Sequence, residues 1–216
     1  MKTIFDKFDK GVIASLPQAA FAGRIEVVSG ESKAKSAVDY LLSQPILGLD
    51  TETKPSFHRG DGHKVALLQV SSHDICFLFR LNHIDMPDCI VQLLSDTEVL
   101  KVGLSWNDDL CMLRRRRDFT PGRFEDIQQI VGTYGIKDMS LQKLYANIFG
   151  QRISKTQRLS NWEADVLTDK QKLYAATDAW ACIMLHEELE RMRQDGYRLV
   201  CTHTDALVED MLSKKQ

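Results

Sequence analysis

Several features that mark particular protein classes are absent or scarce in these 216 residues. The five cysteines include no pair with a C-x-x-C spacing, so the sequence predicts neither a disulfide framework nor a zinc knuckle. This cysteine usage favours a reducing, intracellular compartment, and we expect a cytoplasmic protein. The longest apolar run is AWACIML at 179–185, well short of the roughly 20 residues that cross a bilayer. No membrane association is therefore expected.

An excess of positive charge is also absent. Lys and Arg total 28, Asp and Glu total 30, and the net charge is −2. This balance argues against a protein that coats DNA through a uniformly basic surface, although it permits local basic patches. It also permits acidic sites whose charge a metal ion reverses. The N-terminal stretch contains Asp6 and Asp9 and is interrupted at Pro17, so neither a signal peptide nor a transit peptide is expected.

The composition, 44% hydrophobic and 27% charged, is typical of a globular domain. Strand-like apolar runs occur at 24–29, 46–52, 64–72, 74–81 and 99–105. Helical patterns occur at about 32–42, 89–95, 107–117, 127–134, 140–149 and 168–195, the last beginning with a T-D-K-Q capping box. Three closely spaced strands predict an antiparallel meander, and the later alternation of strand and helix predicts parallel pairing. The expected fold class is α/β, a mixed β-sheet flanked by α-helices.

The chain shows no internal repeat and no low-complexity segment. We therefore expect one domain over residues 24–191, with an N-terminal extension over 1–23 and a C-terminal extension over 192–216. Helical packing of both ends on the same domain is the simplest arrangement.

Two carboxylates stand at the polar end of the run ILGLDTE, residues 46–52. Asp50 and Glu52 are two apart on a predicted strand, so their side chains leave one face while Thr51 points the other way. An isolated D-x-E pair is most often solvated. These two, however, lie where a buried strand emerges, which is where open α/β sheets build their sites.

Asp109 follows a second apolar strand and lies in the first turn of the next predicted helix. Helix dipoles favour carboxylates there, so a simple capping role is the alternative, and Asp108 is a rival for either role. Tyr174 and Asp178 are four residues apart on one face of the last helix. An ionised aspartate amid so much apolar surface is unfavourable unless it is paired or metal-bound.

These four carboxylates, with no arginine partner evident in their segments, predict two divalent cations, Mg²⁺ or Mn²⁺, because all the ligands are oxygen atoms. Two such ions about 3.5–4 Å apart are the known arrangement for in-line displacement at phosphorus. Tyr174, with an ordinary pKa near 10, is a poor base at neutral pH. We expect its hydroxyl to orient the attacking water.

Three segments, in order, resemble the DEDD superfamily of 3′–5′ exonucleases and its tyrosine-containing branch, that of ribonuclease D and the Werner syndrome helicase exonuclease domain. They are LGLDTE (47–52), KVGLSWNDDLCML (101–113) and LSNWEADVLTDKQKLYAATDAWA (159–181). The resemblance covers residues 24–191 and implies an RNase H-like fold. It also implies stepwise release of nucleoside 5′-monophosphates from a free 3′ end. By this resemblance the metal ligands are Asp50, Glu52, Asp109 and Asp178. The residue that positions the water is Tyr174.

The expected partner is therefore nucleic acid, as single-stranded or frayed 3′ ends of DNA or RNA, with no obligate protein partner. Arg152, Lys155 and Arg158, in a loop-like stretch before the third motif, are expected to hold the substrate backbone. Trp106 and Trp162 flank motif residues and are expected to stack on terminal bases. Two alternatives remain open: a non-catalytic nucleic-acid-binding module, and a hydrolase of dinucleotides or very short oligonucleotides.

Overall fold

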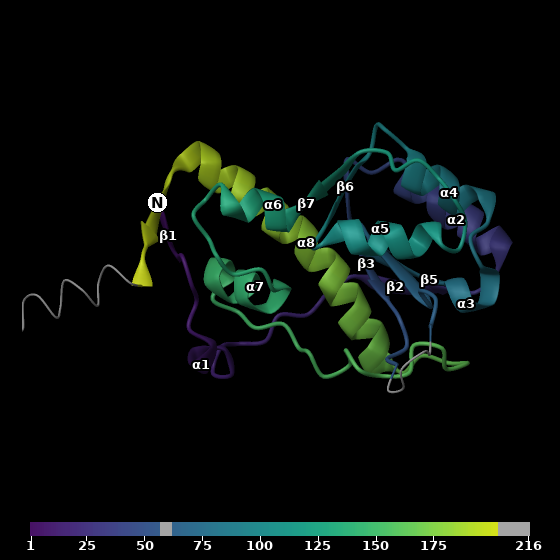
Figure 1. Cartoon of the computed structure of the whole chain (residues 1–216), viewed down its shortest axis with the longest axis horizontal. Coiled ribbons are helices and arrows are strands. Elements are labelled where there is room, and N and C mark those ends of the chain that lie inside the picture. The colour runs from purple at the N-terminus through teal and green to yellow at the C-terminus, as the bar shows by residue number, and fades with distance from the viewer. Residues whose placement is uncertain (57–61, 203–216) are drawn as a thin grey trace, which may run out of the picture.

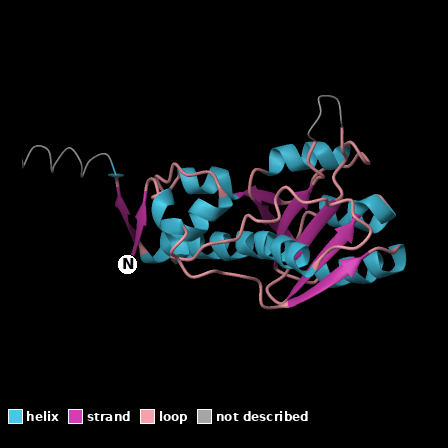
Figure 2. Ribbon diagram, turned by 90° about the horizontal axis from the view of Figure 1, so that it is seen from below, coloured by secondary structure: helices cyan, strands magenta, loops and turns pink. Residues whose placement is uncertain are grey.

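A computed structural model describes residues 1–56 and 62–202, and its centre is a mixed β-sheet of six strands in the order β2-β5-β4-β3-β6-β7 (Figures 1 and 2). The strands are β2 (Arg24–Val28), β3 (Ile46–Glu52), β4 (Leu67–Ser71), β5 (Ile75–Arg80), β6 (Leu100–Gly103) and β7 (Phe124–Asp126). Strands β3, β4 and β5 form the expected antiparallel meander. The pairs β2–β5, β3–β6 and β6–β7 are parallel. The predicted mixed α/β fold is confirmed.

Helices cover both faces of this sheet (Figure 2). On one face lie α2 (Glu31–Leu41), α4 (Asp88–Ser95) and α5 (Trp106–Arg114), packed with Leu47 and Leu49 of β3. On the other lie α6 (Ile127–Gly132), α7 (Leu141–Phe149) and the long α8 (Asp169–Asp195). Two short helices, α1 (Lys10–Ile13) and α3 (Leu81–Ile84), complete the helices of the described chain. None of the helices in residues 1–56 and 62–202 is long and apolar enough to cross a membrane.

The packing of α8 on β3 is unusually close because β3 carries a glycine. A Cβ atom on Gly48 would lie 2.0 Å from the Ala179 carbonyl oxygen of α8 and 2.9 Å from Ile183 Cγ1. The absence of a side chain therefore brings the helix down onto the strand two residues before Asp50. The helix starts with the predicted capping box: Thr168 Oγ1 accepts from Gln171 N (3.2 Å), and Thr168 N donates to Gln171 Oε1 (3.0 Å).

The two ends of the described chain lie side by side, apart from the main sheet (Figures 1 and 2). Strand β1 (Lys2–Phe5) pairs in parallel with β8 (Tyr197–Val200). The expected helical packing is therefore wrong for Lys2–Phe5 and Tyr197–Val200, which are strands, whereas the N-terminal extension also contains the short helix α1. Such pairing joins residues nearly the whole chain apart, and no local pattern indicates it. Residues 203–216 of the predicted C-terminal extension lie outside the described residues.

Candidate active site

Three of the four predicted metal ligands converge where β3 emerges beside α8. Asp50 and Glu52 leave the face of β3 that α8 covers, and Asp178 projects from α8. Each contributes a carboxylate oxygen to a group whose members all lie within 4.8 Å of one another. Glu52 and Asp178 are only 8% and 7% exposed. The strand's alternation and the close helix packing at Gly48 together create this group.

Burial and mutual repulsion both disfavour ionisation of these carboxyl groups. Burial raises the pKa of Asp50 well above its usual range, and the charges of Asp178 and Asp109 raise it further. Burial, followed by the charge of Asp50, raises the pKa of Glu52 to about 10. Burial also raises the pKa of Asp178 to about 7. The ionised cluster therefore requires a compensating positive charge.

Polar atoms without a partner adjoin the same cluster. In the described part of the chain, Asp178 Oδ1 and both side-chain amide atoms of Gln69 are buried without a hydrogen bond. Gln69 is fully buried on β4 and lies directly opposite Asp50 in the β3–β4 ladder. Buried polar atoms are normally satisfied by protein, water or an ion. An all-oxygen carboxylate group with an unsatisfied buried oxygen fits a hard divalent cation such as Mg²⁺ or Mn²⁺.

Asp109 lies beside this group rather than within it. The Thr51 hydroxyl, on the opposite face of β3 from Asp50, donates a hydrogen bond to the Asp109 carboxylate. Burial raises the pKa of Asp109 to about 6, and the Thr51 hydrogen bond acts against the rise. Asp108, the rival, is exposed. The sequence did not indicate a role for Thr51, because its side chain faces away from those of Asp50 and Glu52. Nothing in the local pattern predicts its hydrogen bond to Asp109.

The start of α5, and with it Asp109, is held by Asp126 at the end of β7. The Asp126 carboxylate accepts from the backbone N–H groups of Ser105 and Trp106, both at 3.0 Å, and from Gln128 N at 2.9 Å. Ser105 is left-handed (φ 63°), which is uncommon outside glycine. Asp126 thus caps α6 and also holds the turn that leads to Asp109.

Tyr174 lies one helical turn before Asp178 and is 8% exposed. Its ring packs against Trp162, with centroids 6.0 Å apart. The neighbouring Tyr174 hydroxyl lowers the pKa of Asp178 and opposes the effect of burial. Burial and the neighbouring carboxylates raise the pKa of Tyr174 itself. The side chain therefore stays a neutral hydroxyl that can donate or accept a hydrogen bond.

The expectation that two tryptophans stack on bases is wrong for this structure. Trp162 is fully buried behind the Tyr174 ring, and Trp106 is 3% exposed. Trp106 packs on Phe124, with centroids 5.4 Å apart. It also lies over Gly103, where a Cβ atom would be 1.5 Å from Trp106 Nε1. Both indole rings are therefore part of the core that packs beneath the site. Their positions next to the motifs in the sequence did not indicate that they are buried.

The three basic side chains that were expected to bind the substrate backbone differ in their positions. The charge of Lys155 lowers the pKa of Asp178, and that of Arg158 lowers the pKa of Glu52, so both exposed side chains lie near the carboxylates. Arg152 instead donates from Nε to the carbonyl oxygen of Leu16 at 3.1 Å. Lys155 and Arg158 thus lie near the carboxylates, whereas Arg152 holds an N-terminal segment against the domain.

Several known proteins with similar sequences are named as 3′–5′ exonucleases. The 3′–5′ exonuclease family profile matches residues 25–194. Exonuclease 3′–5′ domain-containing protein 2 of Drosophila melanogaster is 36% identical over 136 residues, which are 61% of this chain and 23% of that protein. A 3′–5′ exonuclease of Arabidopsis thaliana is 30% identical over 196 residues, covering 82% of this chain and 67% of that protein. The bifunctional 3′–5′ exonuclease/ATP-dependent helicase WRN of Mus musculus is 29% identical over 186 residues, covering 81% and 13%. This chain thus spans less than a quarter of the Drosophila and mouse proteins.

Solved structures share the fold at low sequence identity. The Nibbler EXO domain of Aedes aegypti has a TM-score of 0.73 at 17% identity, covering 81% of this chain and 91% of that one. Ribonuclease D of Escherichia coli has a TM-score of 0.69 at 20% identity, covering 79% and 46%. The family match runs from β2 almost to the end of α8 and includes every carboxylate of the site. On these grounds this chain belongs to the 3′–5′ exonuclease family.

Proposed function

We propose that this protein is a divalent-metal-dependent 3′–5′ exonuclease that acts on single-stranded or frayed 3′ ends of nucleic acid. The observation that carries the proposal is the convergence of Asp50, Glu52 and Asp178 within 4.8 Å, beside Tyr174. Water would attack the terminal phosphorus while the bond from phosphorus to the 3′ oxygen breaks. The products would be a nucleoside 5′-monophosphate and a strand with a new 3′ hydroxyl.

The side chains of the site would have different roles in this reaction. Asp50, Glu52, Asp109 and Asp178 would hold two divalent cations, Mg²⁺ or Mn²⁺. When bound, such cations supply the Lewis acidity that activates water and stabilises the leaving oxygen. The Tyr174 hydroxyl would orient the attacking water, since its raised pKa keeps it protonated.

Lys155 and Arg158 would hold the backbone of the substrate on the open side of the cluster. Both are exposed, and both influence the pKa of a cluster carboxylate. A phosphodiester backbone is recognised mainly through such cations. A solved ribonuclease D of Trypanosoma brucei is a complex with RNA U12, so RNA belongs among the substrates to test together with DNA. The proposed location is the cytoplasm.

A time course on matched 5′-labelled DNA and RNA single strands with Mn²⁺ tests the proposal. Wild type should give a ladder that shortens from the 3′ end. Asp178→Ala should abolish the ladder, and Asp108→Ala, which removes an exposed carboxylate next to Asp109, should leave it unchanged.

A binding assay and a series of strand lengths test the alternative functions. Tight oligonucleotide binding without turnover, unchanged by EDTA, would favour the binding module and overturn the proposal. A rate that falls steeply as the strand lengthens would favour a hydrolase of very short oligonucleotides.

A further inference from the structure

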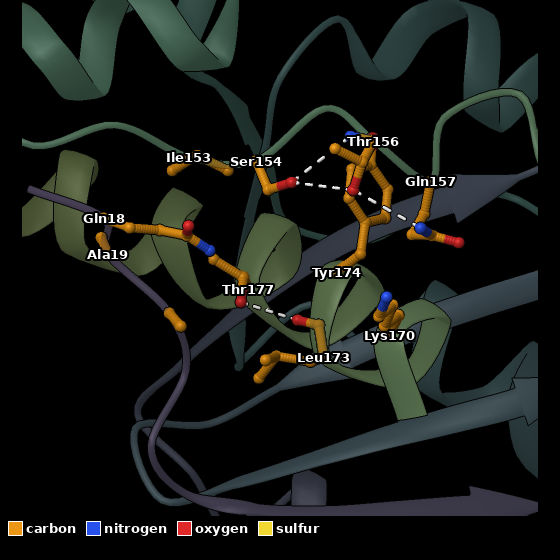
Figure 3. A pocket seen from close by; sticks show the side chains of 11 residues that line it. Gln18, Ala19, Ile153, Ser154, Thr156, Gln157, Lys170, Leu173, Tyr174 and Thr177 are labelled. Carbon is orange, nitrogen blue, oxygen red and sulfur yellow. Dashed lines mark hydrogen bonds between the residues drawn. The ribbon is translucent and has the colours of Figure 1, made fainter. Parts of the chain in front are cut away.

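A pocket of about 380 Å³ opens beside Tyr174 on the flank of α8 (Figure 3). Its walls come from residues 18–20, residues 153–157 and α8, which are far apart in the sequence. Tyr174 lines the pocket and also adjoins Asp178, so pocket and carboxylate cluster are neighbours. The volume lies in the range of small-molecule sites, about 300–1,000 Å³.

One wall of this pocket is a segment that precedes the family match at residue 25. We call residues 16–21 the strap. Its main chain is held at several points: Arg152 N donates to Pro17 O and Ala19 N donates to Arg152 O, both at 2.9 Å. Phe21 N donates to Thr177 Oγ1 of α8 at 3.1 Å. The strap is therefore a fixed wall whose position does not depend on the Gln18 side chain.

The lining combines an apolar surface with unused polar groups. Leu173 is a large apolar side chain that is 38% exposed here. Thr177 is already satisfied, since its hydroxyl donates to Leu173 O and accepts from Phe21 N. The Gln18 amide and the Lys170 ammonium have no protein partner among the described residues. Figure 3 shows Gln18 extending from the strap toward Thr177, with Lys170 at the other end of the pocket.

This chemistry matches an unpaired nucleobase. A glutamine amide both donates and accepts hydrogen bonds, as the edge of a base requires. An exposed apolar side chain can contact the face of a base, and a lysine at the far end can meet an adjacent phosphate. A paired and stacked base presents neither its edge nor its face, so only an extruded or single-stranded base has access.

We propose that the pocket binds one unpaired nucleobase of the substrate strand next to the scissile phosphate, with the strap residue Gln18 hydrogen-bonded to its edge. The inference rests on the proposed exonuclease function and adds a specificity element from outside the family-matched region.

The test compares kcat/KM on single strands that carry a normal base or an abasic nucleotide at the terminal or the penultimate 3′ position, with Mn²⁺. For wild type, removing the base at one of these positions should lower kcat/KM about threefold to tenfold. A loss of this size is expected when a hydrogen bond and the adjoining contacts of the base with the pocket are removed. Gln18→Ala should lower kcat/KM on the normal strand by up to a similar factor, and should be less sensitive to the abasic change than wild type.

Two further variants separate the pocket from general effects. Ala20→Phe fills the pocket from its exposed edge and should also remove the sensitivity to the base. Gln92→Ala removes an exposed glutamine from α4, on the other face of the sheet, and should behave as wild type. All three variants change side chains that the fold does not bury.

The inference is overturned if the abasic nucleotide lowers kcat/KM by the same factor in Gln18→Ala, in Ala20→Phe and in wild type. This outcome counts only if the wild type degrades both strands. The exonuclease function would survive that result. A wild type that shortens no strand would instead overturn the proposed function, and the pocket inference with it.

Discussion

At the scale of single residues, Tyr174 differs from the carboxylates in what its loss should do. Tyr174→Phe keeps the ring that packs on Trp162 and removes only the hydroxyl beside Asp178. We expect kcat to fall about a hundredfold, as for other groups that position a transferred proton or water, with Mn²⁺ affinity unchanged. Steady-state rates across a Mn²⁺ titration measure both. Tyr145→Phe, a buried tyrosine of α7, is the matched control. Unchanged kcat in Tyr174→Phe would contradict the assigned role.

Asp178 makes the metal-free protein sensitive to pH. Its pKa is raised from 3.8 to about 7, so between these values the folded protein keeps a proton that the unfolded chain has lost. The free energy of unfolding should therefore fall as pH rises through this window. In EDTA the Tm of wild type should fall more steeply than that of Asp178→Asn. Mn²⁺ should raise the wild-type Tm more at about pH 8 than below pH 7, because above its pKa Asp178 binds the ion without losing a proton. Parallel Tm curves for the two proteins would refute this account.

At the scale of elements, the site depends on how closely α8 approaches β3. Gly48→Ala would place a Cβ atom 2.0 Å from the Ala179 carbonyl oxygen, so the helix must move away. We expect a loss of about 1–3 kcal/mol in the free energy of unfolding, as for other overpacked sites. Activity should also fall, because Asp178 moves relative to Asp50. Denaturant unfolding and rate measurements test this. Gly30→Ala, where a Cβ would meet nothing within 4 Å, should leave the activity unchanged.

Elements also differ in how far the sequence reveals them. The alternation in ILGLDTE predicted which side chains of β3 share a face, and the capping box predicted the start of α8. Asp109 was placed on the correct helix, but its contact with Thr51 was not predicted. That contact depends on the left-handed turn at Ser105 and on Asp126, 21 residues further along the chain. Local sequence patterns carry no information about such a long-range tertiary contact.

At the scale of the whole molecule, the two ends are joined by a small cluster around a buried carboxylate. Asp6 is 1% exposed and accepts from Lys137 Nζ at 2.8 Å and from Thr202 N at 3.0 Å. These hydrogen bonds, that of Lys137 first, hold the pKa of Asp6 well below its usual range. No sequence pattern predicted this cluster, since it joins residues from the start, middle and end of the described chain.

Asp6→Asn should therefore lower the Tm at neutral pH, with kcat unchanged because Asp6 contacts neither the carboxylates nor the pocket. The contribution of Asp6 is fully present above its ordinary pKa of 3.8 and is lost as pH falls from there through the lower pKa of the folded state, because the unfolded chain takes up the proton first. The Tm difference between wild type and variant should shrink in acid. Asp39→Asn, on the exposed side of α2, is the control. A difference that persists or grows in acid would contradict this role.

The central claim is that Asp50, Glu52 and Asp178 hold the cations of a 3′–5′ exonuclease. The most direct measurement is anomalous scattering from crystals of the wild-type protein soaked in Mn²⁺. The account predicts a Mn²⁺ peak between these three carboxylates, absent from Asp178→Ala crystals treated in the same way. A protein that is active with Mn²⁺ but shows its peak elsewhere, or no peak among these carboxylates, would contradict it.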